Sequence, residues 1–170
     1  MTPSSSQQVE ILVPLLLAVF TILITIVVHA VALGATLQFI RREYQLGRAG
    51  VLFWRDVAIV AGVVLLALIA HLLDMTIWAV LYEGCGEFGS LATAFYNSAI
   101  IYTTLSNSDV IMSGSLKLFG PLEAANGVLI FGVTTAVVFA VMQQLFQNRS
   151  NAGTAPGVRF VPESGHPRAQ

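Results

Sequence analysis

The chain has 170 residues and a formal net charge of −1; 10% of its residues are charged and 56% are hydrophobic. Soluble domains are on average about 25% charged, and a disordered chain would be far less apolar. The lack of a basic excess excludes a nucleic-acid-binding protein, and the single cysteine, Cys85, excludes a disulfide scaffold. These exclusions leave an integral membrane protein, and at this length we expect one domain.

Three long segments are apolar enough to cross a bilayer. Residues 13–40 and 124–148 contain no Asp, Glu, Lys or Arg, and neither do residues 57–73, whose apolar run resumes as far as residue 82. About 20 apolar residues span the hydrocarbon core as a helix, because backbone polar groups in lipid must be paired internally. We predict membrane helices at 11–39, 57–82 and 121–146. The first is too long for a signal peptide and lacks a basic leader, so we assign residues 1–40 to an N-terminal transmembrane helix.

Basic residues are concentrated on one side of these helices. The linker 41–56 carries four arginines and residues 148–170 carry three, whereas the segment between the second and third helices has only Lys117. Because positive residues mark the cytoplasmic side, we predict a multi-pass protein with the N-terminus outside and the C-terminus inside. We expect it in the plasma (inner) membrane of a prokaryote. The linker 41–56 is then a cytoplasmic basic segment, either an interfacial helix or a plain loop. Residues 148–170 are predicted to be a disordered cytoplasmic tail, with no soluble ligand domain.

Residues 90–105 are too apolar for a loop and too short for a span. They carry no charge and follow a glycine-rich turn, and Ser90 is a good N-cap residue. The polar residues after Tyr102 cannot continue a helix into lipid, and irregular backbone at membrane depth is tolerated only where it is buried in protein or lines a water-filled cavity. We therefore predict a re-entrant helix at 90–103 followed by a pore-lining loop at 104–109.

This segment carries a resemblance to a known family. Residues 94–105, Ala-Phe-Tyr-Asn-Ser-Ala-Ile-Ile-Tyr-Thr-Thr-Leu, followed by Ser-Asn-Ser-Asp, resemble the pore helix and filter of the potassium-channel superfamily, which reads Thr-Thr-Val-Gly-Tyr-Gly-Asp at this point. Thr103, Thr104, Leu105 and Asp109 follow that pattern, whereas Ser-Asn-Ser at 106–108 replaces Gly-Tyr-Gly. The resemblance covers about 57–146, where the second and third predicted helices resemble the outer and inner helices of the family.

The resemblance implies an all-α integral membrane fold with three transmembrane helices, a re-entrant pore helix and a filter loop, assembled as a homotetramer around one axis. The pore domain is then 57–147. A single loop cannot enclose a pore, so a pore-forming chain of this size must in any case oligomerise. The implied partners are further copies of the chain and the lipid bilayer. We expect no enzymatic activity and no cofactor other than a permeant cation. The cation-binding residues carried over from the family are Thr104, Leu105, Ser106, Asn107, Ser108 and Asp109.

The replaced glycines change the expected selectivity. In the family, the filter glycines adopt backbone angles that residues with a Cβ dislike, at a cost of roughly 1–2 kcal/mol per residue. Ser106 and Ser108 carry a Cβ, so we expect a relaxed filter that conducts K⁺ and also other monovalent cations such as Na⁺. The alternative is a non-conducting membrane subunit or scaffold that retains the channel fold.

Other residues in the predicted helices have both a functional and a structural interpretation. His71 and Asp74 are ionisable residues three positions apart in the second helix; residues of this kind are functional candidates by default, and the alternative is a pair that docks one helix on another. Gly127 and Gly132 in the third helix are either gating hinges or packing positions.

Three further residues are interpreted from their positions alone. Glu123 follows Pro121 and is expected to complement the dipole at the start of the third helix. Trp78 and Tyr82 are expected in the outer aromatic belt of the membrane.

Overall fold

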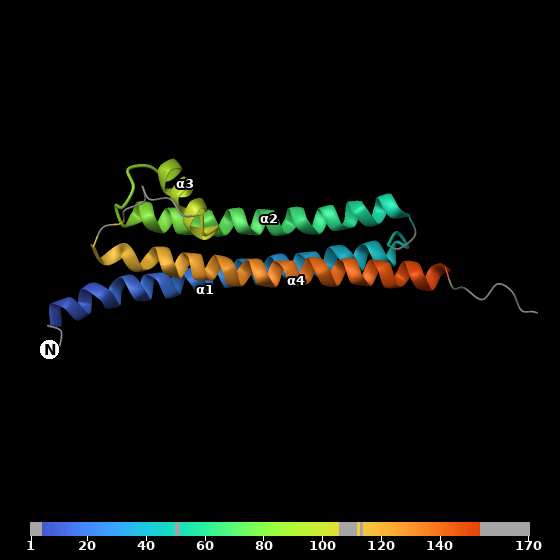
Figure 1. Ribbon diagram of the computed structural model, residues 1–170, viewed down its shortest axis with the longest axis horizontal. Coiled ribbons are helices and arrows are strands. Elements are labelled where there is room, and N and C mark those ends of the chain that lie inside the picture. The colour runs from blue at the N-terminus through green and yellow to red at the C-terminus, as the bar shows by residue number, and fades with distance from the viewer. Residues whose placement is uncertain (1–4, 50–51, 106–111, 113, 154–170) are drawn as a thin grey trace, which may run out of the picture.

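The computed structural model of the chain describes residues 5–49, 52–105, 112 and 114–153. Within these ranges every regular element is helical: α1 (Ser5–Gln45), α2 (Phe53–Gly84), α3 (Leu91–Tyr102), the short 3₁₀ helix η1 (Gly114–Leu118) and α4 (Phe119–Gly153). The helices α1, α2 and α4 form an elongated bundle, and α3 lies beside one end of α2 (Figure 1). The all-helical fold class is thereby confirmed.

Three segments are long and apolar enough to span a membrane: Leu12–Gln45, Phe53–Gly84 and Leu116–Ser150. Large apolar side chains on the outside of the bundle, such as Phe20, Leu65 and Leu129, are more than half exposed. A water-soluble monomer rarely exposes so much apolar surface, whereas surrounding lipid would cover it. The prediction of three helices long and apolar enough to cross a membrane is thereby confirmed.

The helices extend beyond the uncharged runs from which they were predicted. Arg41 and Arg42 belong to the end of α1, and Arg55 and Asp56 to the first turn of α2, so the connection between the two helices is shorter than the predicted linker 41–56. Arg42 in the last turn of α1 and Asp56 in the first turn of α2 have the charges that the helix dipole favours at those ends. Likewise α4 continues through 148–153, at the start of the predicted tail; residues 154–170 lie outside the described residues.

The short helix α3 begins as the sequence predicts. Ser90 has an extended backbone (φ −156°), and its Oγ accepts a hydrogen bond from the backbone N–H of Thr93 at 3.2 Å. This side chain therefore satisfies one of the free donors at the helix start. The helix packs against both α2 and α4.

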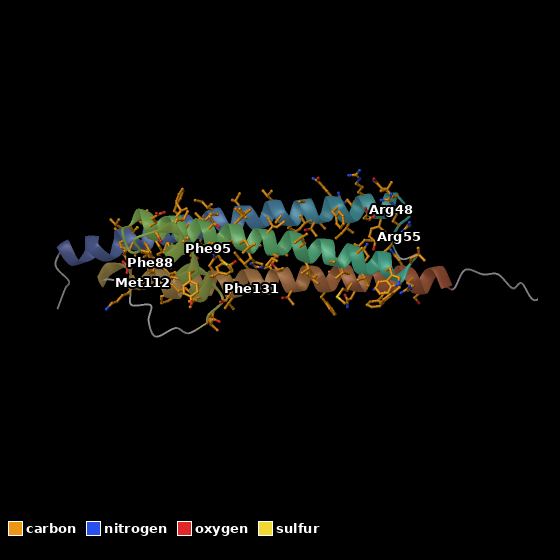
Figure 2. The ribbon with its side chains drawn as sticks, turned by 90° about the horizontal axis from the view of Figure 1, so that it is seen from above. Arg48, Arg55, Phe88, Phe95, Met112 and Phe131 are labelled. Atoms are coloured by element: carbon orange, nitrogen blue, oxygen red, sulfur yellow. The ribbon has the colours of Figure 1, made fainter. Side chains whose placement is uncertain are left out.

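The core beneath α3 is aromatic. Trp78, Tyr82, Tyr102 and Phe119 are fully buried there, so the expected position of Trp78 and Tyr82 in an aromatic belt is wrong: the rings support α3 instead of facing the lipid. Phe88, Phe95 and Met112 lie toward this end of the bundle, and Arg48 and Arg55 lie at the other end (Figure 2).

The helix α1 packs against α2 and α4 along the bundle. Its buried side includes Thr25, whose Oγ1 accepts a hydrogen bond at 3.0 Å from Asn126 Nδ2 of α4. Thr25 donates in turn to the carbonyl of Ile22 at 2.8 Å. A polar contact of this kind holds one apolar helix against another, so α1 belongs to the same helical bundle as α2 and α4.

Candidate functional site

The C-terminal end of α3 is the point where the predicted filter begins. Thr104 and Leu105 are described by the structure, whereas Ser106, Asn107, Ser108 and Asp109 lie outside the described residues. The N–H of Thr104 donates to the carbonyl of Ile101 at 2.9 Å, and the N–H of Leu105 donates to the carbonyl of Ile100 at 2.9 Å. Thr104 has a φ of 57°. Together these features form the Schellman motif that ends many helices, with threonine in the position that glycine usually occupies.

Replacing Thr104 by glycine should stabilise the protein. A β-branched residue in the left-handed region is strained, at a cost of roughly 1–2 kcal/mol, and part of that gain is offset by the greater flexibility of glycine in the unfolded chain. We expect Thr104→Gly to raise the free energy of unfolding by about 1 kcal/mol per chain, measured by thermal unfolding in detergent. Thr104→Ala, which keeps the Cβ, is the control. An equal gain for both variants would contradict the proposed strain.

The last turn of α3 rests on a glycine of α4. A Cβ added to Gly127 would lie 2.3 Å from the backbone carbonyl oxygen of Tyr102, whereas a Cβ added to Gly132 would meet nothing within 4 Å. Both glycines lie inside the continuous helix α4. Of the two predicted hinge residues, Gly127 therefore has a clear packing role, namely the close approach of α3 to α4.

The predicted pair His71 and Asp74 belongs to a larger polar cluster. Tyr102 at the end of α3 donates its hydroxyl to Asp74 Oδ2 at 2.9 Å, and the same hydroxyl lies 3.1 Å from His71 Nδ1. His29 of α1 contributes its Nδ1, 3.0 Å from Asp74 Oδ2, and Thr134 of α4 its Oγ1, 3.3 Å from His71 Nε2. We call His29, His71, Asp74, Tyr102 and Thr134 the polar cluster; all four α-helices contribute to it.

The polar cluster is shielded from its surroundings. Asp74 and Tyr102 are fully buried and His71 is 5% exposed. The ring of Phe131 stacks on His71, with ring centroids 4.3 Å apart; Figure 2 shows Phe131 midway along α4. The structure thus places His71 and Asp74 against the end of α3, as the docking interpretation expects, and adds three partners that sequence analysis did not identify.

A second buried contact joins α2, α3 and α4 close to the first. Glu123 is fully buried, and the Tyr82 hydroxyl donates a short hydrogen bond to its Oε2. Ser98 Oγ of α3 lies 2.5 Å from Glu123 Oε1 and 2.9 Å from the carbonyl oxygen of Met75. The expected role of Glu123 at the helix start is wrong, since α4 has no acidic residue in its first turn. The carboxyl group instead holds α3 in place.

A cavity of about 260 Å³ lies between α1, α2 and α4, beside the polar cluster. Its walls are mostly aliphatic, with His29, Thr36 and Thr134 as the polar exceptions. The ring of His29 therefore borders both the cavity and Asp74.

No protein-family model matches the chain, and the searches of curated proteins and of solved structures found no similar protein.

Proposed function

We propose that the chain is the pore-forming subunit of a homotetrameric cation channel in the plasma membrane, similar in design to the potassium-channel superfamily. The observation that carries this proposal is the short helix α3: it is capped by Ser90, packs against two membrane-spanning helices and ends at the residues that resemble a filter. A helix of 12 residues is too short to cross a bilayer. A re-entrant position is the arrangement in which such a helix delivers a polar loop to a pore.

The contacts of α3 support this proposal. The Glu123 contact, the polar cluster and the close approach at Gly127 all fix α3 on α2 and α4. A fixed helix end is what a pore needs, because cation-binding carbonyl groups must be held at defined positions. The C-terminus of α3 would also direct a partial negative charge toward a cation on the axis.

Ion flux into liposomes tests the proposal. Purified protein in K⁺-loaded liposomes should release K⁺, and should also pass Na⁺, at rates above those of protein-free liposomes. Thr104→Lys would place a cation at the filter and should abolish the flux, whereas Leu91→Lys, at the exposed opposite end of α3, should leave it largely intact. A folded tetramer that passes neither ion would support the second candidate, a non-conducting subunit, which the Ser-Asn-Ser sequence at 106–108 favours.

The proposed topology predicts that Cys85 is accessible from outside the cell. Cys85 is exposed and directly follows α2, at the opposite end of this helix from the arginine-rich connection. An impermeant thiol reagent added to intact cells should therefore label it. Partial burial and the Glu87 carboxylate raise the pKa of the thiol, so labelling should speed up as the pH increases, and mildly alkaline buffer is required.

The control for this experiment is Cys85→Ser, which removes the only cysteine and should abolish labelling. Labelling of wild-type protein only in inverted vesicles would reverse the orientation, with the arginine-rich connection outside.

A further inference from the structure

Three potential metal ligands converge inside the polar cluster. His29 of α1 and His71 and Asp74 of α2 each offer one ligand atom, and these atoms all lie within 4.8 Å of one another. His71 and Asp74 are three residues apart and therefore share one face of their helix. His29 faces them from α1: its ring centroid is 4.9 Å from that of His71, and its Nδ1 is 3.0 Å from Asp74 Oδ2.

Several of these atoms lack a hydrogen-bond partner within the described protein. His29 Nδ1 lies 3.0 Å from Asp74 Oδ2, and neither ring nitrogen of His29 has a side-chain hydrogen bond among the described residues. Asp74 Oδ1 has no hydrogen-bond partner there, although the residue is fully buried. A buried polar group that lacks a hydrogen-bond partner destabilises the folded protein. Asp74 Oδ1 is therefore an acceptor that the cluster's own hydrogen bonds leave unused.

We propose that His29, His71 and Asp74 bind a divalent transition metal ion of the zinc class. Ligand atoms at about 2.0–2.1 Å from a tetrahedral ion lie about 3.3 Å from each other. This separation is compatible with the three ligand atoms here, which all lie within 4.8 Å of one another. Two imidazoles and one carboxylate suit zinc and other divalent first-row transition metals, whereas calcium and magnesium prefer oxygen ligands alone.

The surroundings fit such an ion. Tyr102 donates to Asp74 Oδ2 and would hold the carboxylate from behind, as outer-shell partners do in metal sites. Three protein ligands leave a fourth position for water, and the cavity beside His29 has room for it. Binding would replace the hydrogen bond of one His71 nitrogen, to Tyr102 or to Thr134, with a bond to the metal.

A metal at this position would link α1 directly to α2 and, through Tyr102, to the end of α3. This inference goes beyond the proposed channel activity and does not depend on it, since the ligands and their spacing are the same in a conducting and a non-conducting protein. Its test is accordingly a measurement of binding.

The probe is Co²⁺, whose visible spectrum reports coordination geometry. The protein should carry His166→Ala, because that histidine lies in the C-terminal segment, and a purification tag without histidine. We expect one Co²⁺ per chain, an intense spectrum typical of tetrahedral coordination, and displacement of the Co²⁺ by Zn²⁺. A weak spectrum typical of octahedral coordination would overturn the proposal, and so would binding of less than one Co²⁺ per chain. Either result is decisive without variants of the cluster.

Variants then identify the ligands. His29→Gln, His71→Gln and Asp74→Asn should each weaken Co²⁺ binding by more than about tenfold. Glu83→Gln is the control, since it alters an exposed carboxyl of α2 that is not one of the three ligands and should bind Co²⁺ as the parent does. Circular dichroism confirms that each variant is folded. Unchanged affinity in His29→Gln and Asp74→Asn would mean that the metal binds elsewhere, and the proposal would be wrong.

Discussion

Replacing Gly127 by alanine should destabilise the protein by about 3 kcal/mol or more per chain. Inserting a methyl group into a well-packed core typically costs 1–3 kcal/mol. Here the added Cβ would lie 2.3 Å from the carbonyl oxygen of Tyr102 and 3.2 Å from its carbonyl carbon. These are backbone atoms, so no side-chain rotation relieves the clash, and α3 must move away from α4.

The matched control is Gly132→Ala in the same helix. Its Cβ would meet nothing within 4 Å, and alanine is about 1 kcal/mol more favourable than glycine inside a helix, so this variant should be neutral or slightly stabilised. Thermal unfolding in detergent compares the two. Equal stability of both variants would contradict the packing role of Gly127. A stable Gly127→Ala protein with altered opening would support the hinge interpretation instead.

The features that sequence analysis predicted correctly depend on local signals. The three long helices follow from uncharged runs, because a membrane-spanning segment must be apolar over its own length. The start of α3 follows from Ser90, since an N-cap satisfies donors only three residues away. Neither inference needs knowledge of which helices are neighbours.

The features that were missed depend on packing between helices. The roles of Tyr102, Thr134 and Glu123 arise from partners 25 to 63 positions apart in the chain. Tryptophan is a residue type typical of an aromatic belt, and only the position of Trp78 beneath α3 shows that it is a core residue.

A polar residue in an apolar helix signals a contact but does not identify the partner. The helix ends were also missed. The prediction ended each helix at its first charged residue, whereas α1 includes Arg41 and α2 includes Arg55.

If the chain forms the proposed channel, substituting Ser106, Asn107 and Ser108 should change its ion selectivity more than any other replacement considered. If the filter kept the backbone shape of the potassium-channel family, Ser106 and Ser108 would both be held in disfavoured angles. Two such residues in each of four chains would cost on the order of 8–16 kcal/mol per tetramer, and Asn107 replaces the aromatic residue that braces the family's filter. In the proposed channel, a relaxed loop would avoid this cost. We therefore expect side-chain oxygens to contact a partly hydrated cation, with little discrimination between K⁺ and Na⁺.

The triple variant Ser106→Gly, Asn107→Tyr and Ser108→Gly should raise the K⁺ over Na⁺ permeability ratio by at least about tenfold, which corresponds to about 1.4 kcal/mol. The reason is that glycine adopts the required backbone angles without strain, so carbonyl rings replace the hydration shell of K⁺. The reversal potential with K⁺ on one side of a bilayer and Na⁺ on the other measures this ratio. Ser106→Ala with Ser108→Ala keeps both Cβ atoms and should not sharpen selectivity for K⁺. Strong exclusion of Na⁺ by the wild-type protein would show that the serines tolerate the family's filter geometry, and would place the chain among ordinary potassium-selective pores.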